Sequence, residues 1–118
     1  GRESGCLNNS GSNNNFFGYS SGESNDSGSD NNFFGKFSGR LNQNGSYNNF
    51  FGTRSGYNNL TGSHNIFFGH CAGNNNESGS NNIFFGKDAG VNNVSLTDNS
   101  PAAILNFSDV SFSSFWSY

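Results

Sequence analysis

Two cysteines and two histidines are the residues best suited to chemistry, and their spacing matches no familiar reaction. His64 and His70 lack a second pair of ligands at the separation typical of zinc sites, although His70 adjoins Cys71. The sequence also has no nucleophile elbow, phosphate-binding loop, calcium-binding nonapeptide or paired carboxylates. We therefore expect no catalytic residue, no metal site and no cofactor, and we predict that the protein is not an enzyme.

Asparagine sequons are the one modification signal in the chain. The pattern Asn-x-Ser/Thr begins at Asn8, Asn25, Asn44, Asn59, Asn76, Asn93 and Asn106. All but Asn44 and Asn106 recur at multiples of 17 residues, so covalent glycans on them would line one edge of the molecule. The alternative is that turns use Asn and Ser at these positions for backbone hydrogen bonds. The sequence leaves both interpretations open.

An internal repeat predicts the secondary-structure elements on which the Cys, His and sequon Asn residues lie. The pentad Asn-x-Phe-Phe-Gly occurs five times at intervals of 17 residues, beginning at Asn14, Asn31, Asn48, Asn65 and Asn82. Glycines recur with the same period, and no insertion interrupts the register of the pentads. A short period kept without slippage is typical of a solenoid, in which each repeat forms one coil.

Coils of 17 residues are too short for helical repeats, which need about 33 residues or more. Asn, Ser, Gly and Phe dominate the composition, and the strong helix formers are sparse. We therefore predict an all-β fold, a β-solenoid of about six 17-residue coils stacked about 4.8 Å apart. The repeats occupy residues 1–98. Residues 99–118 are rich in aromatics but lack the repeat, and we predict a C-terminal cap or assembly segment there.

Strand geometry sends alternate side chains of the pentad to opposite faces, so Asn14 and Phe16 share the inner face while Phe17 points outward. The inner columns are a structural Asn ladder of Asn14, Asn31, Asn48, Asn65 and Asn82 and a core ladder of Phe16, Phe33, Phe50, Phe67 and Phe84. The outer assembly ladder is Phe17, Phe34, Phe51, Phe68 and Phe85, joined by Ile66 and Ile83. An exposed aromatic stripe favours the packing of several copies as a bundle or fibre. The alternative is a wider coil that encloses both Phe columns.

Charge and hydropathy exclude two classes of partner. Five basic and eight acidic residues give a net charge of −3. The basic residues form no stripe that could neutralise phosphates, so we expect no nucleic acid partner. No apolar run approaches the roughly 20 residues of a membrane-spanning helix, so we expect no membrane insertion.

The two cysteines cannot bridge within one regular stack. Cys6 and Cys71 lie 65 residues apart, which is not a multiple of 17. Their separation of about four coils, or about 19 Å, exceeds the roughly 7 Å limit between bridged Cα atoms. The thiols are therefore either free or paired between chains.

The repeat pattern also resembles a known family. Its form is Gly-x-x-Asn-x-Ser/Thr-Gly-Ser-x-Asn-x-Phe-Phe-Gly-x-x-Ser/Ala-Gly, best seen from Gly56 to Gly73, and it resembles the head repeats of trimeric autotransporter adhesins and phage-fibre-like proteins. The segment from Leu96 to Pro101, followed by Ile104 and Leu105, is similar to the exit segment after such repeats. The resemblance implies a left-handed β-roll with three chains packed around one axis, displayed outside a bacterium or a virion. The chain departs from the family pattern at two positions. The small residue before the last glycine of each repeat is Ser in the early coils and Ala only at Ala72 and Ala89. The second residue of the Phe pair is aromatic where the family more often has an aliphatic residue.

These observations predict a structural subunit of an extracellular or cell-surface fibre or adhesin head. We expect the chain to self-assemble through its Phe ladders and coil ends, as a trimer or an end-to-end filament, and to contact a host surface. Gly1 aligns with the glycine that closes the pentad, so the first coil opens in its middle, which favours end-to-end joining. Two alternatives are a disordered gel former with Phe-Gly pairs and an ice-binding solenoid, for which regular Thr columns are missing.

Overall fold

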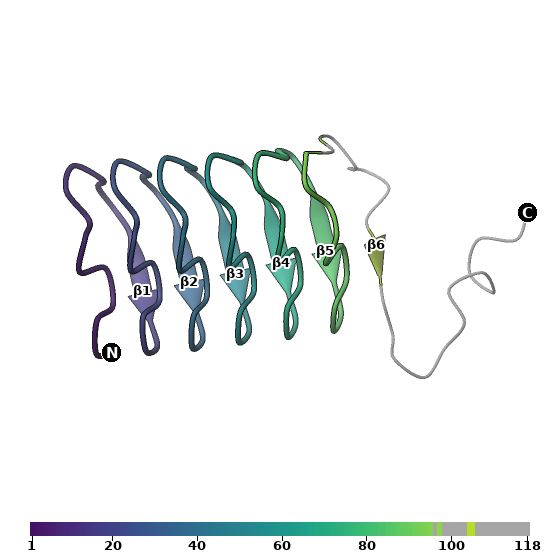
Figure 1. The fold of residues 1–118 in the computed structure, drawn as a ribbon, viewed down its shortest axis with the longest axis horizontal. Coiled ribbons are helices and arrows are strands. Elements are labelled where there is room, and N and C mark those ends of the chain that lie inside the picture. Colours follow the sequence, from purple (N-terminus) through teal and green to yellow (C-terminus); the bar gives the residue numbers. More distant parts are fainter. Residues whose placement is uncertain (96, 98–103, 106–118) are drawn as a thin grey trace, which may run out of the picture.

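The structure is a stack of similar coils, each built from one short strand and a polar loop. The computed structural model describes residues 1–95, 97 and 104–105. One parallel sheet holds the strands in chain order: β1 (Asn15–Phe17), β2 (Asn32–Phe34), β3 (Asn49–Phe51), β4 (Ile66–Phe68), β5 (Ile83–Phe85) and β6 (Ile104–Leu105). Figure 1 shows the strands side by side, with the loops of successive coils repeating along the stack. The predicted all-β solenoid of 17-residue coils is confirmed, and the described residues contain no helix.

Each residue of β1 to β4 pairs with the residue 17 positions later, as Phe16 does with Phe33. We call a set of residues related in this way a column. The last strand departs from the register, because Phe84 pairs with Ile104, which lies 20 residues further on. Of the predicted C-terminal segment 99–118, only β6 lies within the described residues. Its role as a cap or assembly segment stays a prediction, as does the left-handed winding.

Three successive tight turns follow each of the strands β1 to β5 and reverse the chain. After β2, the Ser38 amide donates to the Gly35 carbonyl at 3.1 Å. Phe37 and Gly39, the third residues of two successive turns, have φ angles of 62° and 56°, as type II turns require. Position 39 needs glycine for a second reason, because a Cβ there would collide with the ring of Phe33. This glycine column therefore sets both the path of the chain and the room for the core.

The core is a single file of stacked rings, the inner Phe ladder. Phe33, Phe50, Phe67 and Phe84 are 0–1% exposed, and Phe16 is half-buried against them. Between the buried members, successive ring centroids lie 4.7–4.9 Å apart, close to the spacing of the strands that carry them. Each buried Phe removes about 150–250 Å² from water, so this ladder is the main apolar contribution to stability.

A serine column ties the turn to the strand across the width of the coil. The hydroxyl of Ser38 donates to the Phe50 carbonyl at 3.1 Å, and the same bond recurs in the coils before and after. Ala72 and Ala89 take this position in the later coils and are buried without the bond. The column therefore requires a small side chain, and a hydroxyl is accommodated because a carbonyl faces it.

Buried asparagines form the second continuous ladder of the interior. Asn48 donates its Nδ2 to the Gly62 carbonyl at 2.9 Å and its backbone amide to Oδ1 of Asn31 at 3.0 Å. Oδ1 of Asn48 in turn accepts the backbone amide of Asn65 at 3.0 Å. The inward members are Asn31, Asn48, Asn65 and Asn82, all fully buried, and Asn14, which is half-buried. Among the described residues every buried side-chain nitrogen and oxygen has a hydrogen-bond partner, so the polar interior carries no desolvation penalty from unpaired groups.

Replacing Phe50 by Ala should destabilise the stack far more than replacing its outward neighbour Phe51. Phe50→Ala removes a fully buried ring and leaves a cavity, so we expect the free energy of unfolding to fall by about 3–5 kcal/mol. Phe51→Ala removes a half-buried ring and should cost less than half as much. Urea denaturation followed by circular dichroism measures both changes, and equal losses would contradict the division into inner and outer columns.

Candidate interaction surface

The outer Phe ladder forms a continuous aromatic stripe on the outward face of the sheet. Its members are Phe17, Phe34, Phe51, Phe68 and Phe85. Successive ring centroids lie 4.6–5.0 Å apart, and the rings are within 10° of parallel. Phe17 is 58% exposed and Phe85 is 38% exposed, whereas the three rings between them are half-buried. The described residues thus form a narrow coil with one Phe column outside, not a wider coil that encloses both.

The column beside the outer Phe ladder changes its chemistry along the stack. Over the first three strands it is an amide ladder, in which Asn15 donates to Asn32 and Asn32 to Asn49, both at 2.8 Å. On β4 and β5 the same column holds Ile66 and Ile83, which are half-buried. The outward face of the sheet is therefore apolar over β4 and β5 and half amide over β1 to β3.

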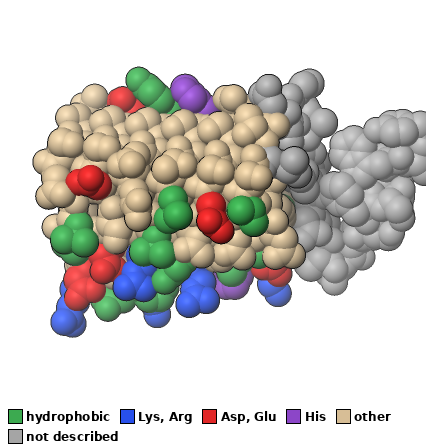
Figure 2. All heavy atoms as spheres, turned by 45° about the horizontal axis from the view of Figure 1, so that its top comes forward, with side chains coloured by type: hydrophobic (Ala, Val, Ile, Leu, Met, Phe, Trp, Pro, Cys, Tyr) green, Lys and Arg blue, Asp and Glu red, His purple; other side chains and the backbone are tan. Residues whose placement is uncertain are grey.

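A second surface follows the turns after the strands, and we call it the turn edge. It is formed by Tyr19, Glu23, Lys36, Phe37, Arg40, Arg54 and Tyr57. All five basic residues of the chain fall in these turns, because Arg2 and Lys87 occupy the same columns. Figure 2 shows Lys and Arg side chains gathered along one edge of the molecule, beside a broad face of uncharged polar groups. The basic residues are thus concentrated on one edge, while the interior columns repeat.

Cations and aromatic rings contact one another along the turn edge. The Arg54 guanidinium lies 5.8 Å from the ring centroid of Phe37 and 5.4 Å from that of Tyr57. Arg40 lies 5.2 Å and 5.9 Å from the same two rings, and the Lys36 ammonium is 5.2 Å from Phe37. An exposed cation–π contact contributes about 0.5–1 kcal/mol. Together these contacts hold exposed side chains in place, and ordered Arg and Tyr residues are typical of interface hot spots.

An ion pair fixes Arg40 from the other side. Its Nε donates to Oε2 of Glu23 at 2.8 Å, and its Nη1 donates to the Tyr57 hydroxyl at 2.9 Å. The hydrogen bond from Arg40 lowers the pKa of the Glu23 carboxyl, although partial burial acts in the opposite direction. The same bond, followed by the one with Tyr57, raises the pKa of Arg40 further above its ordinary value.

The sequon asparagines of the repeated column face inward. Asn25, Asn59 and Asn76 are fully buried, and Asn8 and Asn93 are half-buried. The Nδ2 of Asn59 donates both to Oδ1 of Asn42 and to the Gly62 carbonyl, each at 2.7 Å. Because both N–H bonds are engaged inside the coil, a glycan has no room at the buried sites while the coil is folded.

Asn42 makes the hydrogen bonds of the sequon column without being part of a sequon. Its side chain is buried in the same column and donates to Oδ1 of Asn25 at 2.7 Å and to the Gly45 carbonyl at 2.9 Å. This is the turn chemistry that the sequence left as an alternative to glycosylation. Asn44, which lies outside the column, is exposed, and its glycosylation stays a prediction. Asn106 lies outside the described residues.

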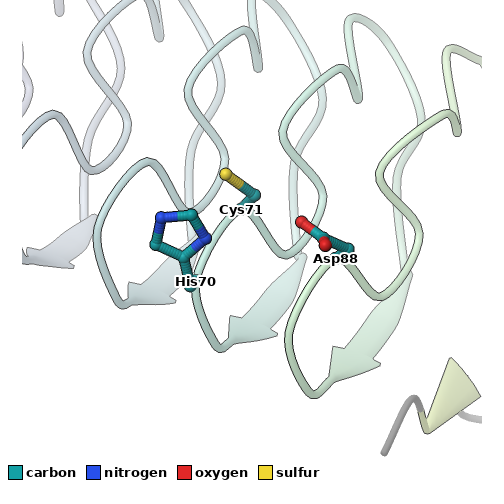
Figure 3. A group of neighbouring side chains, drawn as sticks. All are labelled: His70, Cys71 and Asp88. Atoms are coloured by element: carbon teal, nitrogen blue, oxygen red, sulfur yellow. The ribbon is translucent and has the colours of Figure 1, made fainter. Parts of the chain in front are cut away.

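His70, Cys71 and Asp88 lie together beside the turn edge. Their ligand atoms, one on each side chain, are all within 4.8 Å of one another. Figure 3 shows Asp88 on the coil after the one that carries His70 and Cys71, with its carboxylate pointing toward that turn. Short ligand spacings in the sequence indicate no metal-binding partner for His70 and Cys71, although Asp88 follows Cys71 by one period of 17 residues. His64 lies elsewhere and stacks on Tyr47, with ring centroids 4.8 Å apart.

Both cysteines have free thiols, Cys6 in an exposed position and Cys71 half-buried. Burial raises the pKa of the Cys71 thiol, and the negative charge of Asp88 adds to this effect. The positive charges of Arg54 and Lys87 act in the opposite direction. The Cys71 thiol is therefore predominantly protonated at neutral pH.

A hollow at the first coil is the open end of the stack. It is lined by residues that include Ser4, Asn8, Asn14 and Phe16. In later coils the members of these columns pack against the preceding coil. The hollow is therefore a cross-section of the solenoid and provides no pocket built for a small ligand.

Comparison with known proteins identifies no relative. No protein-family model matches the chain, and neither a curated protein nor a solved structure shows a significant match. Within the described residues, no helix is long and apolar enough to cross a membrane. The candidate functional features are therefore the outer Phe ladder, the turn edge and the cluster of His70, Cys71 and Asp88.

Substituting the sequon residue Asn59 distinguishes a structural amide from a glycan acceptor. In unglycosylated protein, Asn59→Gln adds a methylene to a buried side chain and disrupts its two hydrogen bonds, so we expect the free energy of unfolding to fall by about 1–3 kcal/mol. The exposed sequon residue supplies the control, since Asn44→Gln should change stability by less than about 0.5 kcal/mol. Urea denaturation measures both, and a neutral Asn59→Gln would overturn the structural role.

The Glu23 carboxylate should stabilise the fold at neutral pH and cease to do so in acid. Its pKa is lowered in the folded protein, so its contribution is present above the unfolded-state pKa of about 4.3 and is lost as pH falls through the folded-state value. We expect Glu23→Gln to cost up to about 1 kcal/mol at pH 7. The difference between variant and parent should be smaller at pH 2 than at pH 7. Thermal unfolding at both pH values tests this, and a pH-independent difference would contradict it.

Proposed function

We propose that this chain is a structural segment of an extracellular fibre or adhesin head, in which solenoids associate side by side through the outer Phe ladder. The observation that best supports this proposal is that five Phe residues form one unbroken stripe, which the described residues leave partly exposed. Placement outside the cell rests on the resemblance of the repeats to adhesin and fibre proteins.

The exposed stripe is large enough to drive association. Five rungs at strand spacing extend over about 20 Å, and aromatic patches of a few hundred Å² on a protein surface are typical of interaction sites. At about 25 cal/mol per Å² of apolar area, covering such a patch contributes several kcal/mol before the entropic cost of association. Ile66 and Ile83 widen the apolar part over β4 and β5.

The best partner for the stripe is another copy of the same repeat. Aromatic rungs 4.6–5.0 Å apart are complementary to a surface with the same period, and a second coil of this chain provides one. The rungs of two copies can interdigitate along their whole length, whereas a globular partner would match only a few of them. Symmetric self-association of this kind is the common form of protein oligomer.

In such an assembly the turn edge remains available for a further partner. Its Arg and aromatic side chains are held by mutual contacts and so lose little entropy on binding. This surface is the part of the molecule that we assign to contact with a host or matrix component. The alternative of a gel former requires Phe-Gly pairs in a disordered chain, whereas the five described pairs each end a strand of the sheet.

Polar substitutions in the outer Phe ladder should abolish self-association without unfolding the chain. We expect the unmodified protein to sediment as an oligomer at about 100 µM, well above the dissociation constant of a typical protein interface, and the double variant Phe51→Asn, Phe68→Asn to sediment as a monomer with an unchanged circular dichroism spectrum. The control is Tyr57→Asn, because Asn74 already occupies that column one coil later, and it should assemble normally. A monomeric parent, or a double variant that assembles like the parent, would refute the proposal.

A further inference from the structure

We propose that His70, Cys71 and Asp88 form a zinc-binding site that joins two neighbouring coils. The three side chains present an imidazole nitrogen, a sulfur and a carboxylate oxygen within 4.8 Å of one another. This is a ligand set that Zn²⁺ uses in proteins, and it is assembled from two successive turns rather than from one contiguous motif (Figure 3).

The geometry is close to that of a tetrahedral site. With bonds of about 2.0–2.3 Å, the ligand atoms of a zinc ion lie roughly 3.3–3.6 Å apart, so a shift of about 1 Å in the side chains completes it. His70 and Asp88 are exposed and can rotate to provide this shift, while Cys71 is half-buried and fixes the position of the sulfur. The scaffold beneath them is rigid, because the Asp88 amide donates to the His70 carbonyl at 2.8 Å and the Cys71 amide to the Thr53 carbonyl at 3.0 Å.

Charge and softness both select zinc over the hard cations. When zinc binds, the Cys71 thiol loses its proton to solvent, so a thiolate and a carboxylate neutralise the two positive charges of the ion, and the imidazole binds as a neutral ligand. Calcium and magnesium prefer sites made of oxygen atoms only, whereas sulfur and imidazole nitrogen suit zinc. Three protein ligands leave the fourth position for water or for a ligand from another molecule.

The site bridges the stack, because Cys71 and Asp88 occupy one column on adjacent coils. Zinc held between them links the coil that begins after β4 to the coil that begins after β5. Binding to the folded state alone shifts the unfolding equilibrium toward that state, so zinc should raise the temperature of unfolding as well as saturate a site. The rise in unfolding temperature can be measured without knowing the biological activity of the protein.

The repeat itself supplies the control variants. Cys71→Ser copies Ser20 and His70→Thr copies Thr53, each a residue that the same column already accommodates in another coil. All measurements are made on the full chain carrying Cys6→Ser, which removes the other thiol. Circular dichroism of each variant checks that the fold is kept.

Titration with zinc chloride and with cobalt(II) tests the site. In the Cys6→Ser protein we expect saturation at one zinc per chain, a thiolate-to-cobalt charge-transfer band and a higher unfolding temperature with zinc. Adding Cys71→Ser should remove the band and the thermal shift, and adding His70→Thr should weaken zinc binding by about tenfold or more, or 1.4 kcal/mol. No saturable binding in the Cys6→Ser protein, or binding unchanged by Cys71→Ser or His70→Thr, would overturn the proposal.

Discussion

Backbone hydrogen bonds between coils hold the residues of β1 to β5 over their counterparts 17 positions away, and the remaining features depend on that register. The Asn15 amide donates to the Asn31 carbonyl at 2.8 Å, and Asn32 donates to Asn48 in the same way one coil later. Because the offset never changes between β1 and β5, phenylalanine stacks on phenylalanine and amide bonds to amide. A slip of one residue would place rings over amides and break both interior ladders together, so the register is strongly specified. The chain needs only a small apolar core, because each coil packs against the coils before and after it.

The period and the two-residue alternation of strands were sufficient to predict the fold and the opposite directions of Phe16 and Phe17. They did not predict that the column of Asn42 and Asn59 faces inward, because Asn and Ser occur in turns on either side of a coil and only the path of the loop decides between them. The contacts of Arg40 and Arg54 with rings depend on side-chain conformation and left no sequence pattern. Asp88 lies 17 residues after Cys71, so the period alone predicts that the two residues are neighbours. The short ligand spacings of contiguous metal-binding motifs do not include such partners, because these residues are neighbours only across adjacent coils.

The coil separates positions that must repeat from positions that vary. Asn, Phe and Gly columns inside the stack tolerate no change of size, as Gly39 against Phe33 shows. The turn edge instead carries a different residue in almost every coil, including Phe37 and Arg54 at positive φ, where glycine would be more stable by about 1–2 kcal/mol. Large side chains are thus kept at a conformational cost where the surface has room for them, and Tyr47 and His64 do the same in another column, with φ angles of 59° and 60°. The aromatic outer face and the varied turn edge can coexist because each occupies its own columns.

Because β1 to β5 share one register and one ladder of stacked Phe rings, the number of coils is not dictated by folding. Deleting or duplicating one 17-codon unit of the coding sequence would shorten or lengthen the rod by about 4.8 Å and leave every ladder intact. An in-frame gain or loss of one repeat therefore changes the length of the rod without changing the contacts that hold its interior together. The reach of the protein and the order of side chains along its turn edge can therefore evolve independently of the architecture that carries them.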